Sequence, residues 1–222
     1  MCLIVVAHQA FEGFPLLIAA NRDEEYSRPT VPAHFWPDYT EVLGGRDGLH
    51  GGTWLAITKR GRFAAVTNLR GAVRSSDSLS RGELVNRFVT GMQSPLEYAK
   101  SIDVSRYAGF HLFVGEVGGE LALVSGTVKS LGRGIHGLSN APHGEHWPKV
   151  DTAVEAIRTL RTPEEILRFL GPPMKYGDPT RDIFIAGDRY GTRSSTAIVA
   201  DAKSVAFAEQ NYGLFGRFSY VY

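Results

Sequence analysis

Short apolar runs separated by turn residues dominate the chain, and this pattern predicts strands. Residues 2–8 and 16–20 are two such runs, and the glycine and proline of residues 12–15 between them are typical of a turn. The two runs therefore predict a hairpin of buried strands. Further runs predict strands at residues 53–58, 63–68, 110–117, 120–125, 182–186, 196–200, 204–209 and 216–222.

Helical signals fall in two blocks between these strands. Capping boxes, in which a hydroxyl residue precedes a glutamate by three positions, occur at Ser80, Ser94 and Thr162. Residues 149–160 carry apolar side chains at helical spacing. Four helices, arranged as two consecutive pairs, are therefore predicted.

Two segments are predicted to be ordered loops. Residues 26–50 are dense in proline, and residues 132–142 are rich in glycine. Hairpins dominate the order of the remaining elements, which predicts an α+β fold of two mostly antiparallel sheets covered by helices. Because no linker, repeat or low-complexity tract interrupts the sequence, residues 1–222 are expected to form a single domain.

Composition narrows the classes of function. The chain has 24 Lys and Arg against 23 Asp and Glu, so charge favours neither nucleic acid nor an anionic membrane as a partner. A single cysteine excludes an internal disulfide and a multi-cysteine metal site. No apolar run reaches the roughly 18 residues of a membrane span, and no signal peptide is evident, so a soluble cytoplasmic protein is expected.

Cys2 is that single cysteine, and it opens the first predicted strand. Removal of the initiator Met would leave it with a free α-amino group. A thiol and an amine on one residue supply a nucleophile and a base for acyl transfer. The alternative is that Cys2 is a small apolar residue in a buried strand.

Other polar residues could support this chemistry. Arg22 could hold a thiolate or a substrate anion, and Asp23 could orient Arg22 or the Cys2 amine; the alternative is a solvated turn. Asn140 could donate into an oxyanion hole or be an ordinary turn residue. Arg193 begins a strand among hydroxyl residues.

Metal and nucleotide sites are not expected. His143 and His146 have only weak metal-ligand spacing, and the glycines of residues 44–52 match neither a Walker loop nor a dinucleotide fingerprint.

Eight motifs in order resemble the NRDE family, also called the transport and Golgi organisation protein 2 family. They are Met1-Cys2-Leu3-Ile4, Ala20-Asn21-Arg22-Asp23-Glu24, Tyr26-Ser27-Arg28-Pro29, Gly51-Gly52-Thr53-Trp54-Leu55, Thr67-Asn68, Gly137-Leu138-Ser139-Asn140, Trp147-Pro148-Lys149 and Gly191-Thr192-Arg193-Ser194-Ser195-Thr196. The resemblance implies an N-terminal-nucleophile hydrolase fold, a four-layer αββα sandwich.

The resemblance also implies a set of site residues. In the related cysteine acylases the N-terminal cysteine attacks an amide carbonyl, its own amine shuttles the proton, and two arginines, an aspartate and an asparagine complete the site. The similar positions here are Cys2, Arg22, Asp23, Asn140 and Arg193. Those acylases usually space the early pair as Arg-x-x-Asp, whereas Asp23 adjoins Arg22 here.

The expected function is a cysteine-dependent hydrolase of a small acyl amide or thioester, which needs no cofactor. Trp54, Asn21 and Asn68, which lie in the shared motifs, are expected to contact the substrate.

The alternative is a carrier on the same fold for haem, a lipid or acyl-CoA. Such a carrier would use aromatic residues and a histidine as ligand, the candidates being Phe35, Trp36, Trp54, His8, His50, His136 and His143. A third hypothesis is a scaffold protein with an exposed apolar patch.

Overall fold

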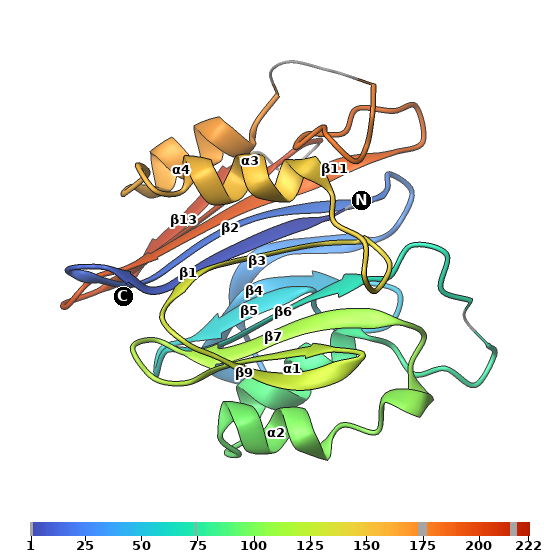
Figure 1. Ribbon diagram of the computed structural model, residues 1–222, viewed down its shortest axis with the longest axis horizontal. Helices are drawn as coiled ribbons and strands as arrows, with labels where there is room; N and C mark the ends of the chain where they lie inside the picture. The colour runs from blue at the N-terminus through green and yellow to red at the C-terminus, as the bar shows by residue number, and fades with distance from the viewer. Residues whose placement is uncertain (1, 74, 173–176, 214–216) are drawn as a thin grey trace. The chain divides into compact units, whose positions relative to one another are not determined.

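The chain forms two compact units, each with one sheet and its own helices (Figure 1). The computed structural model describes residues 2–73, 75–172, 177–213 and 217–222. Unit 1 contains Met1–Arg28, Arg133–Ala141 and Glu145–Tyr222, and unit 2 contains Pro29–Gly132 and Pro142–Gly144. The expectation of one domain over residues 1–222 stays a prediction.

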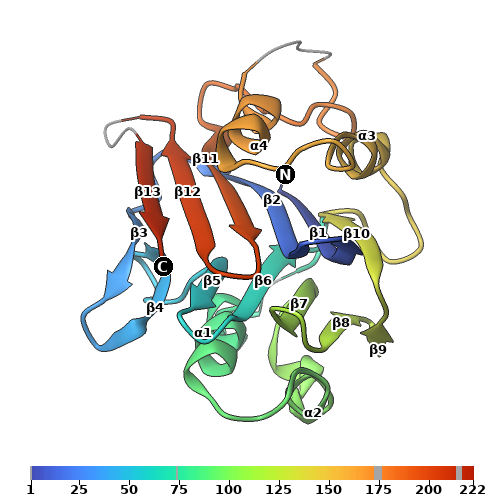
Figure 2. The ribbon, with the colours of Figure 1, turned by 90° about the vertical axis from the view of Figure 1, so that its left-hand side faces the viewer.

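Unit 1 is built on a six-stranded antiparallel sheet with the order β10-β1-β2-β11-β12-β13 (Figure 2). Its strands are β1 (Leu3–Phe11), β2 (Phe14–Glu25), β10 (Gly134–Ser139), β11 (Tyr190–Ala200), β12 (Val205–Asn211) and β13 (Arg217–Val221). β1 and β2 form the predicted hairpin, and their turn uses Gly13 at a positive φ of 78°. The apolar run of β1 is continuous because this strand is central and buried.

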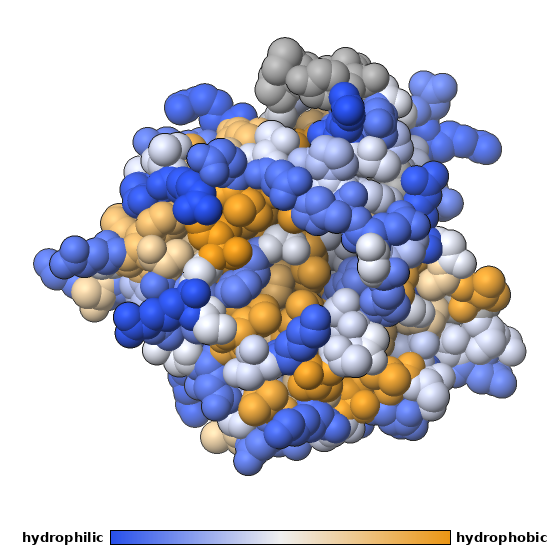
Figure 3. Space-filling view, viewed as in Figure 1, coloured by the Kyte–Doolittle hydropathy of each residue, from blue (hydrophilic) through white to orange (hydrophobic). Residues whose placement is uncertain are grey.

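Two helices, α3 (Pro148–Ala156) and α4 (Pro163–Leu170), pack on one face of this sheet. Alternate residues of the strands, such as Leu3 and Leu17, form a cluster with Val150 of α3 and Ile166 of α4. The capping box predicted at Thr162 is confirmed. Figure 3 shows mainly hydrophilic residues over the outward face of α3, as expected for an amphipathic helix.

Unit 2 is built on a seven-stranded antiparallel sheet whose strands follow chain order from β3 to β9. They are β3 (Thr30–Trp36), β4 (Tyr39–Asp47), β5 (Leu55–Thr58), β6 (Arg62–Asn68), β7 (Phe110–Glu116), β8 (Leu121–Ser125) and β9 (Thr127–Leu131). The hairpins predicted from residues 53–68 and 110–125 are confirmed. β9 was not predicted, because its polar, half-exposed residues carry little apolar signal.

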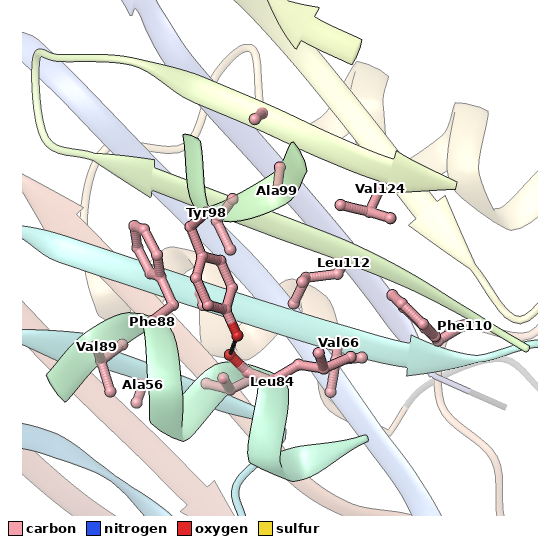
Figure 4. Packing of buried hydrophobic residues seen from close by; sticks show 14 of the residues in the cluster. Ala56, Val66, Leu84, Phe88, Val89, Tyr98, Ala99, Phe110, Leu112 and Val124 are labelled. Atoms are coloured by element: carbon pink, nitrogen blue, oxygen red, sulfur yellow. Dashed lines mark hydrogen bonds between the residues drawn. The ribbon is translucent and has the colours of Figure 1, made fainter. Parts of the chain in front are cut away.

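Helices α1 (Gly82–Thr90) and α2 (Pro95–Ser101) cover an apolar cluster of unit 2, and the short 3-10 helix η1 (Val104–Arg106) follows them. Figure 4 shows Phe88 of α1 and Tyr98 of α2 among strand residues such as Leu112. The Tyr98 hydroxyl donates a hydrogen bond of 2.6 Å to the Leu84 carbonyl.

One of the predicted helix starts in unit 2 is wrong. The capping box at Ser94 is confirmed, but α1 starts at Gly82, so Ser80 lies outside the N-cap position. The start of α1 lies so close to the backbone of Gly52 and Thr53 that a Cβ at Gly82 would come within 2.9 Å of it. Tertiary contact, rather than the local capping signal, sets this helix start.

The prediction of a loop over residues 26–50 is wrong, because β3 and β4 pair there. β3 is an edge strand, and Pro32 lies at the register shift between Val31 and His34, where a missing N–H costs no ladder hydrogen bond. Pro29 and Pro37 lie outside both strands. The edge position therefore tolerates a proline density that a central strand would not.

The loop predicted over residues 132–142 is also wrong, because β10 pairs with β1. A Cβ at Gly137 would lie 2.5 Å from Val150, so the glycine that weakens the strand signal lets α3 approach. The strand predicted over residues 182–186 is wrong as well: this segment has only an isolated bridge between Ala186 and Gly191.

Several element ends also differ from prediction: β2 continues to Glu25 rather than ending at residue 20, and β11 begins at Tyr190 rather than at residue 196. α3 ends at Ala156, four residues before the predicted end. The final strand is confirmed as β13, whereas the predicted first residue, Gly216, lies outside the described residues. In the part of the chain that the structure describes, no helix is long and apolar enough to cross a membrane.

Candidate functional site

The pairing of β1 with β2 places Cys2 beside Asp23. Leu3, the first residue of β1, pairs with Asn21, so Cys2 lies just before β1 and alongside the last residues of β2. The backbone N–H of Asp23 donates to the Cys2 Sγ at 3.4 Å, and the same sulfur lies 3.7 Å from the Asp23 carbonyl oxygen. The cysteine is half-buried. A backbone donor aimed at a sulfur favours its ionised form.

The groups around this sulfur shift the pKa of the Cys2 thiol in opposite directions. Burial raises the pKa of the Cys2 thiol, and the negative charge of Asp23 raises it further. The Asp23 N–H hydrogen bond and the Arg22 guanidinium act in the opposite direction. The resting side chain is therefore a thiol, and ionisation needs additional positive charge or a base.

Asn140 lies on the other side of Cys2. β10 pairs with β1 from Leu3 opposite Ser139, and Asn140 is the first residue after the end of β10. It is 7% exposed. β1 is flanked by β10 and β2 (Figure 2). The registers of these two pairings place Asn140 on one side of Cys2 and Arg22 on the other. The predicted asparagine and cysteine are thus brought together.

Arg22 and Asp23 are adjacent in β2, and successive side chains of a strand point to opposite faces of the sheet. Both are buried, with exposures of 5% and 4%. The Arg22 guanidinium lies 3.7 Å from the Glu24 carboxylate, which is also 3.6 Å from Arg28. The Arg22 and Asp23 side chains thus lie on opposite faces of the sheet, and they act on the pKa of the Cys2 thiol in opposite directions.

The Asp23 carboxylate and backbone are fixed by β11. The Thr192 hydroxyl donates to Asp23 Oδ1 at 2.7 Å, and the Tyr190 hydroxyl donates to the Asp23 carbonyl oxygen at 3.0 Å. Thr192 Oγ1 in turn accepts from the Ile185 N–H at 2.9 Å. Sequence reasoning did not single out Tyr190, which precedes the shared glycine motif by one residue.

Arg193 holds the main chain that follows β2. It occupies the register shift between Thr192 and Ser194, and its Nη1 donates to the carbonyl oxygens of Glu25, Tyr26 and Arg28 at 2.8, 2.9 and 3.1 Å. These hydrogen bonds fix the end of the β2 segment. The geometry therefore favours a positioning role for this arginine.

The buried side chain of Asn21 forms hydrogen bonds to three separate segments of unit 1. Its Nδ2 donates to the carbonyl oxygens of Leu170 and Ile183 at 3.0 and 2.9 Å, and its Oδ1 accepts from the Ser195 hydroxyl at 2.6 Å. Ser195 Oγ also lies 3.0 Å from the Tyr212 hydroxyl. These protein hydrogen bonds favour a structural role over the expected contact with a substrate.

Lys149 is a second residue that the sequence did not single out. It belongs to the first turn of α3 and is 0% exposed. Burial lowers the pKa of its ammonium, whereas the negative charges of Asp23, Cys2 and Asp182 raise it. A lysine on an amphipathic helix is normally assigned to the solvent face; only its place in the shared Trp-Pro-Lys motif could have indicated this position.

The other two residues expected to contact a substrate, Trp54 and Asn68, belong to unit 2. Trp54 is half-buried and packs against the apolar cluster under α1, where Gly45 makes room for its ring. Asn68 ends β6 and is exposed. The structure thus groups Cys2, Arg22, Asp23 and Asn140 in unit 1 and leaves these two in unit 2.

The candidate haem ligands are divided between the two units. His8 in β1 and His136 in β10 belong to unit 1, whereas His50 and His143 belong to unit 2. The Trp36 side chain is fully buried and donates to the Gly44 carbonyl oxygen at 2.9 Å. Among the residues that the structure describes, no group of three or more His, Cys, Asp or Glu is placed to hold a metal ion.

The amino-acid sequence is similar to those of one protein family. The model of a family described as Transport and Golgi organisation 2 matches residues 1–167. The Transport and Golgi organization protein 2 homolog of Bos taurus is 32% identical, over 90% of this chain and 87% of its own length. Transport and Golgi organization protein 2 of Drosophila melanogaster is 27% identical, over 86% of this chain and 84% of its own length.

Solved structures show the fold. A mutant of the conjugated bile acid hydrolase from Clostridium perfringens is similar with a TM-score of 0.55 at 10% identity, over 99% of this chain and 92% of that chain. Penicillin V acylase from Agrobacterium tumefaciens is similar with a TM-score of 0.54 at 14% identity, over 99% and 85%. The expected α+β, N-terminal-nucleophile hydrolase-like fold is confirmed.

Proposed function

Because the chain belongs to the transport and Golgi organisation 2 family and has an N-terminal-nucleophile hydrolase-like fold, we propose that it is a cysteine hydrolase of small acyl amides or thioesters. One observation carries the proposal. The only cysteine of the chain lies half-buried at the open end of the β1–β2 hairpin, with the Asp23 N–H donating to its sulfur. A cysteine nucleophile in acyl transfer is more reactive when neighbouring groups stabilise its ionised form.

In the proposed reaction the Cys2 sulfur attacks the carbonyl carbon of the substrate. The thiol proton passes to the Cys2 α-amine, which is freed when Met1 is removed, and from there to the leaving nitrogen or sulfur. The carbon–sulfur bond forms first and gives a tetrahedral oxyanion, and the bond to the protonated leaving group then breaks. Water then attacks the thioester, its proton returns to Cys2, and the carboxylic acid leaves.

The neighbouring residues take distinct roles in this proposal. Asn140 donates from its side-chain amide to the oxyanion, beside the Cys2 position that β10 and β1 share. Arg22 supports the thiolate or a substrate carboxylate. Asp23 supplies the N–H at the sulfur, and Arg193 keeps the β2 end in place.

The test is turnover of a panel of fluorogenic acyl amides and acyl-CoA thioesters, with intact-mass spectrometry of the same protein. We expect loss of Met1, an acyl adduct on Cys2 under single-turnover conditions, and a rate at least 100-fold lower in Cys2→Ala. Met92→Ala is the matched control, because this side chain is 85% exposed and lies in unit 2. Full activity in Cys2→Ala, or quantitative retention of Met1, would overturn the proposal.

A carrier of haem, a lipid or acyl-CoA on the same fold is the competing outcome. It predicts stoichiometric binding without product release. A haem absorbance titration with His8→Ala, His50→Ala, His136→Ala and His143→Ala separates the two functions, because a carrier with axial ligation loses its Soret shift in one variant. Turnover that depends on Cys2, with no such shift, favours the hydrolase.

A further inference from the structure

Lys149 stands where an amphipathic helix normally places an apolar residue. Its side chain is completely buried, and its neighbour Val150 packs in the same cluster as Leu3, which follows Cys2. α3 contacts both β1 and β10. The backbone N–H of Lys149 donates to the Thr180 carbonyl oxygen at 3.1 Å, which fixes the start of the helix against the segment before β11. A buried ammonium is costly unless negative charge compensates it.

The compensating charges come from two separate elements. The buried side chains of Asp23 from β2 and Asp182 from the segment before β11 stabilise the charged form of Lys149, and Cys2, which precedes β1, acts in the same direction once it is a thiolate. The Lys149 ammonium also lies 5.6 Å from the centre of the Trp147 ring, within the range of a cation–π interaction. The lysine therefore belongs to the charge network that contains the candidate nucleophile.

The charged groups around Cys2 complete this network. Asp23 opposes formation of a thiolate, because a second negative charge would develop beside a buried carboxylate. Arg22 acts in the opposite direction. Tyr190 stays a neutral phenol, because burial and the nearby negative charges raise its pKa. A second cation that attracts Asp23 would relieve the repulsion.

We propose that Lys149 is a positioning residue whose ammonium offsets Asp23 and so lets Cys2 ionise. This inference rests on the proposed role of Cys2 as the nucleophile. Lys149 keeps its proton throughout, forms no bond to the substrate, and contributes only charge at a fixed place. Asp23 can then orient the site without suppressing the thiolate. The alternative, a lysine that only stabilises the fold, predicts no change in the ionisation of Cys2.

The single cysteine makes this testable without knowledge of the substrate. The rate of alkylation by iodoacetamide, followed by intact mass from pH 5 to pH 11, reports the ionisation of Cys2 alone. Lys149→Met keeps the length and apolar stem of the side chain but removes the charge. We expect its alkylation profile to move up by at least one pH unit, with a rate at pH 7 about tenfold lower and an unchanged plateau at high pH.

Two further variants test the sign of the effect. Asp23→Asn keeps an acceptor for the Thr192 hydroxyl and should move the profile to lower pH. The Asp23→Asn/Lys149→Met double variant should return towards the wild-type profile, because both charges of the offsetting pair are gone. Lys203→Met is the matched control, since Lys203 is an exposed lysine of the same unit, and its profile should not move.

A profile of folded Lys149→Met within 0.3 pH units of wild type would overturn the inference. If that variant does not fold, the reciprocal measurement on the Cys2→Ala variant decides the question. The lysine ε-carbon resonance of Lys149 should titrate at lower pH in Cys2→Ala than in wild type, because a negative partner has been removed. An unchanged titration also overturns it. Failure of either test leaves the turnover experiment on Cys2→Ala unaffected, so the two proposals fail separately.

Discussion

The two units share a plan of one antiparallel sheet and two helices, yet they bury different kinds of side chain. In unit 2 the cluster under α1 and α2 is apolar. The buried polar residues described in unit 2 are Thr53, Thr58, Thr67 and His111. In unit 1 the buried polar and charged residues include Asn21, Arg22, Asp23, Asn140, Lys149, Asp182, Thr192, Ser194, Ser195 and Glu209.

This difference distinguishes side chains that stabilise the fold from side chains that could take part in a reaction. Buried charges contribute little net stability, because desolvation offsets their attraction. A unit selected for stability alone would resemble the apolar cluster of unit 2. Among the buried polar groups of unit 1, Arg22, Asp23 and Asn140 are those that the proposed chemistry at Cys2 would use. Two measurements, the free energy of unfolding and the alkylation rate of Cys2, test the comparison.

The largest expected effect on stability is in unit 2. Phe88 is fully buried, lies 5.3 Å from the Tyr98 ring centre, and carries the Arg62 guanidinium 4.2 Å above its own ring. Phe88→Ala should reduce the free energy of unfolding by about 4 kcal/mol, because it leaves a cavity in a close-packed cluster. Chemical denaturation measures this loss. The alkylation profile of Cys2 should stay unchanged below the transition; a shifted profile would show that the units are not functionally distinct.

A smaller loss of stability, with an effect on the site, is expected for Asn21. Asn21→Leu removes three hydrogen bonds and leaves two carbonyl oxygens and the Ser195 hydroxyl short of partners. The free energy of unfolding should fall by about 3 kcal/mol. Because Asn21 precedes Arg22 and pairs with Leu3, the alkylation rate of Cys2 should change as well. Asn68→Leu, at an exposed position of unit 2, is the control and should alter neither quantity.

The smallest expected effect is a pH dependence. The pKa of the Cys2 thiol is raised in the folded protein, so the unfolded chain releases its proton first, from about pH 8.5 upward. The contribution of Cys2 to stability is therefore complete below that pH and is lost as the pH rises towards the folded pKa. Relative to Cys2→Ala, wild type should lose at most about 1.4 kcal/mol per pH unit.

Lys149 acts with the opposite sign. Its pKa is lowered in the folded protein, so its contribution to stability is present above the unfolded pKa and is lost as the pH falls. Lys149 is present in both proteins, so the comparison cancels its own titration and leaves the contribution of Cys2 together with the Cys2–Lys149 coupling. Denaturation series between pH 7 and pH 10 measure the difference, and parallel curves for the two proteins would contradict a raised thiol pKa.

Local signals in the sequence determined much of the architecture. Continuous apolar runs predicted β1 and β2, because a central strand buried on both faces needs no alternation. The capping boxes at Ser94 and Thr162 predicted helix starts, because the hydrogen bonds that define them join residues three positions apart. The single cysteine at position 2, together with the ordered motifs, predicted where a site would lie.

Only the tertiary structure decided which residues surround Cys2 and what they do. The pairing of β10 with β1 brings Asn140 beside Cys2, although more than half of the sequence separates the two residues. The packing of α3 on the sheet buries Lys149. Arg193 and Asn21 bind main-chain carbonyl oxygens that no motif identifies. The physical reason is that strand register and helix packing are set by contacts between distant segments. A local pattern can predict an element, but not the partner against which that element buries its polar groups.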